Sequence, residues 1–239
     1  MVAFDDSDDP VLFETTDGIA HIRLNRPEAR NAVTVEMADR LTDVAEAVEE
    51  HEDVSAIVLT SSGPVFCAGL DQAVMQADDE SVLTGLQETL FALYEWFRTV
   101  RIPVITGAQG HAVGAGASLL CYCSDLPVIA EGAKVWWPEI QYGVLNRKRA
   151  VHLTHLVGPA RAAEIVLLGD EAQVPAPDAH YHGLVSHVVD DPDEVEGTCT
   201  EMAETIATID GKYGIIGDYL EAIYHAREAM MGPSLEWAE

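Results

Sequence analysis

The chain has 239 residues, of which 48% are hydrophobic, and its formal net charge at pH 7 is −28 because 41 acidic residues oppose 13 basic ones. A chain of this length and apolar content can bury one substantial core, which excludes a disordered acidic protein. No apolar window is long enough for a membrane span. The negative charge also argues against nucleic-acid binding, which needs a basic surface.

The carboxylates are dispersed along the chain, apart from short runs at residues 5–9 and 190–191. A surface for a cationic partner would gather them in one place. The distribution therefore favours a halophilic source, in which salt screens the self-repulsion of the folded chain. We expect such a protein to lose stability when salt is removed.

Residues 1–10 form an acidic segment that we expect to be mobile. Aspartates stand where a secretory signal would carry positive charge, so the sequence predicts a cytoplasmic protein. The cysteines show neither a paired framework nor metal-ligand spacing, and we expect reduced core residues and no metal site. The four cysteines are Cys67, Cys121, Cys123 and Cys199.

Two strands are predicted at residues 11–15 and 19–24, joined by the turn Thr16-Asp17-Gly18. Apolar residues alternate along the second strand, which leaves His21 and Arg23 on the opposite face. We expect His21 to be a solvated strand residue.

Apolar residues recur at helical spacing over residues 34–50 and 81–100, which predicts two helices that cover the core. Asp71 precedes the second of them at a turn, where an aspartate usually caps a helix. Two further helices and a strand at 185–189 are expected after Gly158, and then a helical tail from about residue 193 to 231.

The chain is organised around residues 106–118, where a strand ending at Ile105 runs into a turn of small residues that opens a helix. Backbone N–H groups at the start of such a helix are uncovered and can bind an oxygen that gains negative charge. Tight packing is the alternative explanation of the small residues.

A second turn of small residues, 65–71, follows the predicted strand 56–60 and offers another backbone donor. A third stretch adds the carboxylate of Glu139 between Trp137-Pro138 and Ile140. Burial among apolar residues would raise the pKa of Glu139 and suit it to proton transfer near neutral pH. Two donors and one carboxylate could stabilise and protonate an enolate.

These three stretches, together with Leu24-Asn25-Arg26-Pro27-Glu28-Ala29-Arg30-Asn31-Ala32, resemble the crotonase superfamily, also called the enoyl-CoA hydratase/isomerase family. The resemblance covers about residues 11–190. It implies an α/β fold, a crotonase-type spiral of repeated ββα units with a C-terminal helical trimerisation region. The implied division is an acidic N-terminus at 1–10, a spiral core at 11–190 and a helical region at 191–239.

The resemblance also implies a site and a substrate. The peptide N–H groups of Ala68 and Ala115 would form an oxyanion hole for the carbonyl of an acyl-CoA or enoyl-CoA thioester, and Glu139 would be the acid and base. Coenzyme A would enter as part of the substrate, with no separate cofactor, and the assembly would be a homotrimer or hexamer without nucleic acid or membrane. The implied coenzyme A contacts are Arg26, Glu28, Ala29, Arg30, Ala68, Leu70, Asp71 and Gly114.

Two departures from the family pattern matter. Two-carboxylate hydratases carry a glutamate where this chain has Ser118, so the sequence favours a Δ3,Δ2-enoyl-CoA isomerase with one glutamate. A hydratase or acyl-CoA hydrolase on the same fold, and a catalytically silent acyl-CoA binder, are the alternatives. In addition, Arg147-Lys148-Arg149 stands where many members have a proline- and glycine-rich turn. We rank a subunit contact, or a helix start without a ligand, above substrate binding for this cluster.

Overall fold

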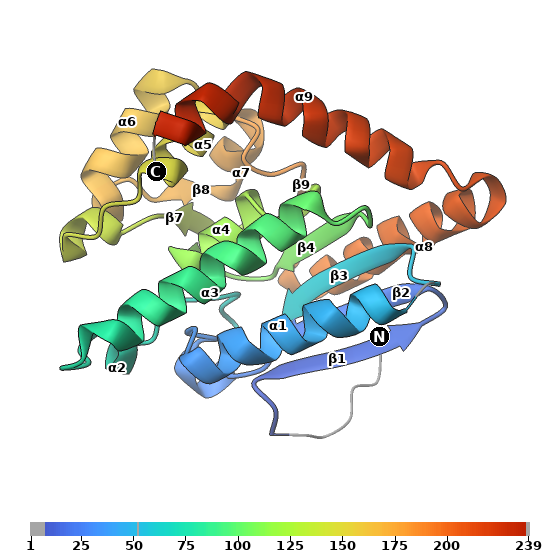
Figure 1. Cartoon of the computed structure of the whole chain (residues 1–239), viewed down its shortest axis with the longest axis horizontal. Helices are drawn as coiled ribbons and strands as arrows, with labels where there is room; N and C mark the ends of the chain where they lie inside the picture. Colours follow the sequence, from blue (N-terminus) through green and yellow to red (C-terminus); the bar gives the residue numbers. More distant parts are fainter. Residues whose placement is uncertain (1–7, 52, 238–239) are drawn as a thin grey trace.

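A computed structural model describes residues 8–51 and 53–237 of the protein, so the expectation for residues 1–7 lies outside the described part. Its centre is a six-stranded sheet in the order β1-β2-β3-β4-β6-β9 (Figure 1). The first pair is antiparallel and every later pair is parallel. These strands are β1 (Val11–Thr16), β2 (Ile19–Leu24), β3 (Ala56–Ser61), β4 (Val104–Ala108), β6 (Leu126–Ala130) and β9 (His187–Val189).

The hairpin of β1 and β2 is confirmed. Asp17 and Gly18 form its turn with φ of 51° and 75°, and Thr16 pairs with Ile19. Positive φ at two successive turn residues suits the right-handed twist of the flanking strands. The hairpin places β2 against β3, which begins the parallel part of the sheet.

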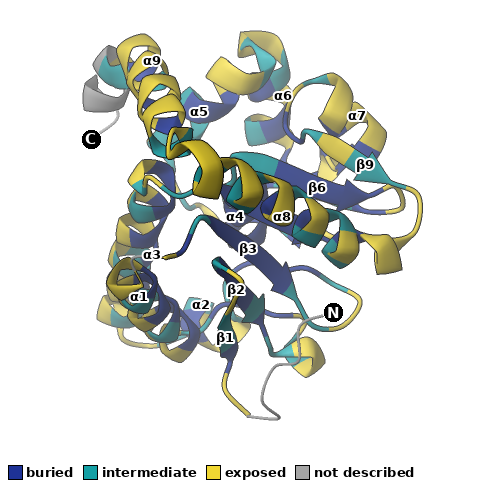
Figure 2. Ribbon diagram, turned by 90° about the vertical axis from the view of Figure 1, so that its right-hand side faces the viewer, coloured by how far each residue is buried: buried dark blue, intermediate teal, exposed yellow. Residues whose placement is uncertain are grey.

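Helices cover both faces of the sheet (Figure 2). Helices α1, α3 and α4 belong to the main core on one face, and α8 closes a smaller core on the other. The described helices are α1 (Val35–Glu50), α2 (Gln72–Met75), α3 (Glu80–Thr99), α4 (Ala115–Cys121), α5 (Arg147–Val157), α6 (Pro159–Leu168), α7 (Ala176–Tyr181), α8 (Val195–Tyr213) and α9 (Ile216–Trp237). Parallel strands buried on both faces explain the nearly continuous apolar run of β3.

The expectation that His21 is solvated is wrong. His21 is only 4% exposed, because α8 packs across the face of β2 that was expected to meet solvent. Arg23 on the same face forms an ion pair with Glu196 of α8. Burial lowers the pKa of His21, with Glu196 acting in the opposite direction.

Helices α1 and α3 occupy nearly the ranges that their periodicity predicts. Thr34 caps α1 by accepting from the Met37 N–H, and Asp79 caps α3 by accepting from the Ser81 N–H. A second sheet of three short strands, β5 (Ala112–Val113), β7 (Lys134–Trp136) and β8 (Val174–Pro175), lies beyond the main sheet. It positions the segments that form the candidate site.

The predicted helical tail consists of two helices, α8 and α9. Gly214 ends α8 with φ of 62°, a left-handed conformation that glycine adopts without strain, and α9 then packs against α5 and α3. In the part of the chain that the structure describes, no helix combines the length and hydropathy of a membrane span. The four cysteines are all buried and unbridged.

Candidate active site

The two turns of small residues lie against each other. The Val113 N–H donates to the Cys67 carbonyl at 2.9 Å, and Cys67 and Ala112 form an isolated parallel bridge. A Cβ on Gly116 would come within 2.5 Å of the Cys67 carbonyl oxygen. Close packing therefore requires glycine at position 116, and this packing brings the turn at 65–71 to the start of α4.

The Ala68 N–H is not available to a ligand, which corrects the prediction for this residue. It donates to the Arg30 carbonyl at 3.0 Å. The next bonds join Val33 N–H to the Gly69 carbonyl and Asp71 N–H to the Val33 carbonyl, at 2.8 and 2.9 Å. Between them the Leu70 N–H has no acceptor among the described residues. The uncovered donor of this turn is thus that of Leu70.

The Ala115 N–H, which the sequence predicts as a donor, has no acceptor among the described residues. Ala115 is the first residue of α4, and the first N–H of this helix to find a helical acceptor is that of Ser118, which donates to the Gly114 carbonyl. A Cβ on Gly69 would lie 3.9 Å from the Ala115 nitrogen, so the two turns approach closely. Gly69 has φ of 92°, which also favours glycine there.

Glu139 lies beside this pair of donors. It begins a short 3-10 helix, Glu139–Tyr142, after β7, and its Oε1 would be 3.7 Å from a Cβ on Gly114. A cleft of about 380 Å³ is lined by Ala68, Leu70, Gly114, Ala115 and Glu139 together. Apolar and aromatic side chains complete much of its wall, among them Leu90, Phe91, Tyr94, Tyr142 and Val144.

An arginine that sequence reasoning placed elsewhere reaches into the site. Arg149 Nη1 donates to Glu139 Oε1 at 2.5 Å and to the Gly114 carbonyl at 3.2 Å. The two side chains are 13% and 22% exposed. Apolar side chains do line the cleft that holds Glu139, but a guanidinium that the sequence analysis did not expect lies against its carboxylate.

A local signal for this orientation exists in the sequence. Asn146 caps α5 by accepting from the Arg149 N–H at 3.0 Å, so Arg149 occupies the third helical position. Side chains of a first helical turn point back toward the helix start. Asn-x-x-Arg after Glu139 thus directs this arginine, rather than its two basic neighbours, toward the cleft.

Ser118 is buried at 2% exposure, and its hydroxyl donates to the Gly114 carbonyl at 3.0 Å. Its hydroxyl therefore holds the backbone of the turn before α4, and the position supplies no carboxylate. Among the described residues that line the cleft, the acids are Glu139 and Asp170. Asp170 is exposed and accepts from Trp136 Nε1 at 3.0 Å.

The loop after β2 lies next to the cleft, but its side chains do not line it. Arg26 donates to the Ala32 carbonyl at 2.6 Å and pairs with Asp71 at 3.3 Å. Asp71 accepts from the Ala73 N–H, so its predicted role as a cap is confirmed. Glu28 and Ala29 belong to a short 3-10 helix, and the Arg30 side chain is exposed. Contacts of these residues with coenzyme A stay predictions.

Asn31 holds this loop to the oxyanion turn, a role that the sequence analysis did not assign. It is fully buried, and its Nδ2 donates to the carbonyls of Ser62 and Val65 at 2.8 and 2.9 Å. Its Oδ1 accepts from the Arg26 N–H at 2.8 Å. These three hydrogen bonds of one buried side chain fix the turn at 65–71 relative to the loop after β2.

The parallel sheet, the paired small-residue turns and the adjacent glutamate define an α/β protein of the crotonase superfamily. A sequence model described as enoyl-CoA hydratase/isomerase matches residues 14–228. The chain belongs to the enoyl-CoA hydratase/isomerase family.

Individual relatives agree with this assignment. The chain is 32% identical over 202 residues to a probable enoyl-CoA hydratase of Mycobacterium bovis, covering 83% of this chain and 77% of the relative. It is 34% identical over 199 residues to one of Rhizobium meliloti, covering 83% and 75%. A crystal structure of an enoyl-CoA hydratase/isomerase from Xanthobacter autotrophicus Py2 superposes with a TM-score of 0.85 at 29% identity, covering 96% and 86%.

Proposed function

We propose that the protein moves the double bond of an enoyl-CoA thioester from the Δ3 to the Δ2 position, with Glu139 as its one acid and base. The observation that supports this most directly is that the chain has a glutamate at position 139 and a serine at position 118. Glu139 lines the cleft with the donor pair, and the residue at the second family position is a buried serine bonded to the backbone. The other acid of the cleft, Asp170, is exposed and accepts from Trp136. Bond migration needs one proton carrier, whereas water addition is helped by two carboxylates.

In the proposed reaction the thioester oxygen accepts from the N–H groups of Leu70 and Ala115. Glu139 takes a proton from C2, the C2 electron pair is delocalised into the carbonyl as an enolate, and the donors stabilise the oxygen that gains charge. The carboxylic acid then returns the proton to C4 as the double bond forms between C2 and C3. Each donor would lower the barrier by about 3 kcal/mol, as in other oxyanion holes.

Arg149 holds only one oxygen of Glu139. The guanidinium contacts Oε1, and Oε2 has no hydrogen-bond donor among the described residues. Proton transfer through Oε2 is therefore compatible with the ion pair, which would fix the carboxylate while one oxygen stays reactive. Coenzyme A belongs to the substrate in this proposal, and we propose a homotrimer or a pair of trimers in the cytoplasm of a halophilic organism.

Hydration is the second candidate, and the descriptions of the relatives favour it, since those of Mycobacterium bovis and Rhizobium meliloti are named probable enoyl-CoA hydratases. Here Glu139 would have to activate water alone or with Asp170, the other acid that lines the cleft.

The two candidates are separated by following double-bond position and mass in molar salt with 3-hexenoyl-CoA and, separately, 2-hexenoyl-CoA. Isomerisation moves the double bond at constant mass, and we expect this outcome. Hydration adds one water to the 2-enoyl substrate, and oxygen-18 from labelled water would appear in the product. Mass gain without bond migration would reject the isomerase in favour of the hydratase. If both substrates stay unchanged and show no solvent exchange at C2, a binding role takes the place of both.

A further inference from the structure

A second cavity, of about 680 Å³, adjoins the reaction cleft and is lined by the Glu139–Tyr142 segment, α5, α6 and α9. Glu139, Val144, Asn146 and Arg149 line both this cavity and the reaction cleft. The ion pair of Glu139 with Arg149 is therefore part of the partition between them. Any acyl chain that extends past Glu139 would meet this partition first.

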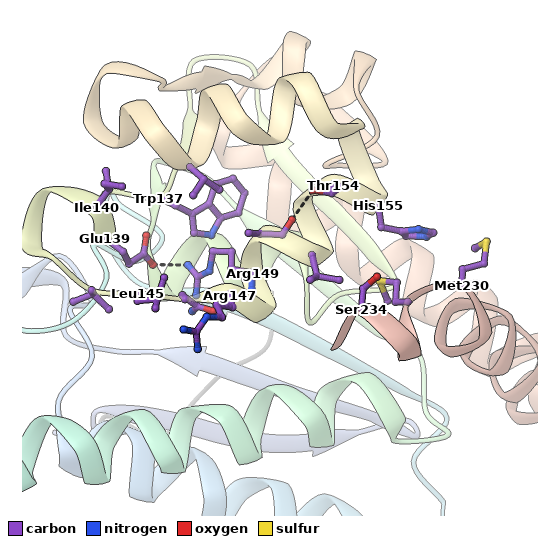
Figure 3. A pocket seen from close by; sticks show the side chains of 16 residues that line it. Trp137, Glu139, Ile140, Leu145, Arg147, Arg149, Thr154, His155, Met230 and Ser234 are labelled. Atoms are coloured by element: carbon purple, nitrogen blue, oxygen red, sulfur yellow. Dashed lines mark hydrogen bonds and ion pairs between the residues drawn. The ribbon is translucent and has the colours of Figure 1, made fainter. Parts of the chain in front are cut away.

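The cavity is positively charged at the end that meets the cleft. In a chain with 41 acidic and 13 basic residues, the described residues that line it include two arginines and a histidine but one acid, Glu139. Figure 3 shows Arg147 and Arg149 gathered with Glu139 and Leu145 at one end, while Thr154, His155, Met230 and Ser234 lie at the other.

Hydrogen-bond donors at this end are unused. Only Nη1 of Arg149 has acceptors among the described residues, and Nε and Nη2 are not sealed off from solvent. Trp137 lines the same cavity at 4% exposure, and its indole Nε1 is a buried donor without an acceptor in the described chain. That nitrogen is closed off from the cavity, so the donors open to a ligand there are those of the arginines.

We propose that this end of the second cavity binds a carboxylate of the acyl group, so that the substrate is the monothioester of an unsaturated dicarboxylic acid. This inference rests on the proposed function, because the acyl group reaches the cavity only when its thioester occupies the oxyanion turn. The planar fork of Arg149 can hold Glu139 with one nitrogen and the substrate carboxylate with the other two. Arg147 adds a second positive charge.

Apolar residues also line the cavity, among them Val151, Val166 and Met231, and these fit a neutral chain better than a charged one. A neutral acyl chain is thus the rival occupant, and the phosphates of coenzyme A are a second source of negative charge for the arginines. The charge at the cleft end decides between the carboxylate and the neutral chain, since a hydrocarbon passing there would leave those donors without acceptors.

Binding of two saturated thioesters of equal chain length tests the proposal without turnover. Titration calorimetry in molar salt compares hexanedioyl-CoA, which ends in a carboxylate, with hexanoyl-CoA, which ends in a methyl group, and free coenzyme A serves as the third ligand. We expect hexanedioyl-CoA to bind at least about tenfold more tightly than hexanoyl-CoA, a difference of about 1.4 kcal/mol. Equal or weaker binding of the dicarboxylic thioester would overturn the proposal.

Variants assign the preference to residues. Arg147→Met should reduce the preference while hexanoyl-CoA affinity stays close to that of the unchanged protein. Arg149→Met should remove most of it, measured as the ratio of the two affinities, because this residue also holds Glu139 and the Gly114 carbonyl. Arg161→Met is the matched control, because this arginine pairs with Glu164 on α6 and does not line the cavity. A loss of affinity of the same factor for free coenzyme A would assign the arginines to phosphate binding and reject the carboxylate site.

Failure of this inference and of the proposed function give different results. Hexanoyl-CoA that binds, and 3-hexenoyl-CoA that is isomerised, without a preference for the dicarboxylic forms, would reject the dicarboxylic substrate alone. No binding of either acyl-CoA would reject both.

Discussion

Arg149 and Glu139 meet between the reaction cleft and the second cavity, with Nη1 of the guanidinium 2.5 Å from Oε1 of the carboxylate. The same nitrogen lies 3.2 Å from the Gly114 carbonyl, one residue before Ala115, the proposed oxyanion donor. One side chain thus joins the acid and base of the proposed reaction to the backbone of the oxyanion turn. Its rigidity should decide how well the two parts of the site are aligned.

Replacing Glu139 by glutamine tests the role of the carboxylate. The amide keeps the size of the side chain and can still accept from Arg149, but it cannot carry a proton between C2 and C4. We expect turnover of 3-hexenoyl-CoA to fall by about 10²–10⁴-fold, as is typical when a general base is lost. Acyl-CoA affinity, measured by calorimetry, should stay nearly unchanged. Retained turnover would remove Glu139 from its proposed role.

Replacing Arg149 tests whether it positions Glu139. Arg149→Met removes the charge and the bonds to both Glu139 and Gly114, whereas Arg149→Lys keeps a charge that can contact one oxygen. We expect kcat for a neutral 3-enoyl-CoA to fall about tenfold or more in the methionine variant, because misplaced groups lose the benefit of orientation. KM should change little, and lysine should restore part of kcat.

A purely structural role for Arg149 predicts a different pattern. Loss of packing would lower the melting temperature, and lysine and methionine would then have similar effects on kcat. Comparing kcat, KM and melting temperature across the two variants separates these cases, with Arg161→Met as the unaffected reference.

Single-atom changes of the backbone test which N–H groups form the oxyanion hole. Replacing an amide by an ester, through incorporation of a hydroxy acid, removes one N–H and keeps the side chain. At position 70 we expect kcat to fall about 10²–10³-fold with little loss of stability. At position 68 we expect the free energy of unfolding to fall by about 1 kcal/mol, since that N–H bonds the Arg30 carbonyl, and kcat to be nearly normal. The reverse result would restore Ala68 as the donor.

Local patterns were enough to predict much of the fold. The hairpin at Asp17-Gly18 and the helices α1 and α3 follow from turn residues and periodicity, which are properties of neighbouring residues. The residue of the small-residue turn whose N–H is uncovered could not be predicted in the same way. Whether the N–H of Ala68 or of Leu70 is uncovered depends on the pairing of this turn with Arg30 and Val33, which is set by tertiary contacts.

His21 and Glu139 both have neighbours that the sequence analysis did not expect. His21 was expected to be solvated, but α8, which begins at Val195, returns to cover β2. Glu139 was expected among apolar neighbours because Trp137 and Ile140 are adjacent in sequence, whereas its decisive neighbour Arg149 comes from the next helix. Burial by a distant helix cannot be inferred from periodicity, which reports only the face of one element. The signal for Arg149 is a helix cap and is likewise not part of a periodic pattern.

Acid sensitivity should arise in part from His152. This residue is buried on α5, and its Nε2 lies 2.8 Å from the Tyr122 hydroxyl. Burial, assisted by the positive charges of Arg98, Arg149, Arg227 and His155, lowers the pKa of His152 from 6.5 to about 2.

Below pH 6.5 this histidine is therefore protonated in the unfolded chain but stays neutral in the folded chain. Its contribution to stability is complete above this pH and is lost progressively as the pH falls toward 2, by up to about 1.4 kcal/mol per pH unit. Burial raises the pKa of Asp125, which acts in the opposite direction, so the difference between variants is the informative quantity.

We expect His152→Gln to flatten the dependence of unfolding free energy on pH between 6.5 and 4.5, measured by denaturant titration. His187→Gln, on the exposed edge strand β9, should leave the slope unchanged. Equal slopes for the unchanged protein and His152→Gln would show that His152 is protonated in the folded state.

Salt dependence tests the explanation of the charge. With a net charge of −28, self-repulsion should weaken the fold at low ionic strength, and molar salt should screen it. We expect the melting temperature to rise steadily from low to molar KCl, by about 2–4 °C for each kcal/mol gained. Sucrose serves as the control, because it strengthens burial without screening charge.

The triple variant Asp39→Asn, Glu46→Gln, Glu50→Gln neutralises three exposed carboxylates of α1. Its melting temperature should depend less strongly on KCl. A melting temperature that is the same in low and molar salt would contradict adaptation to high salt.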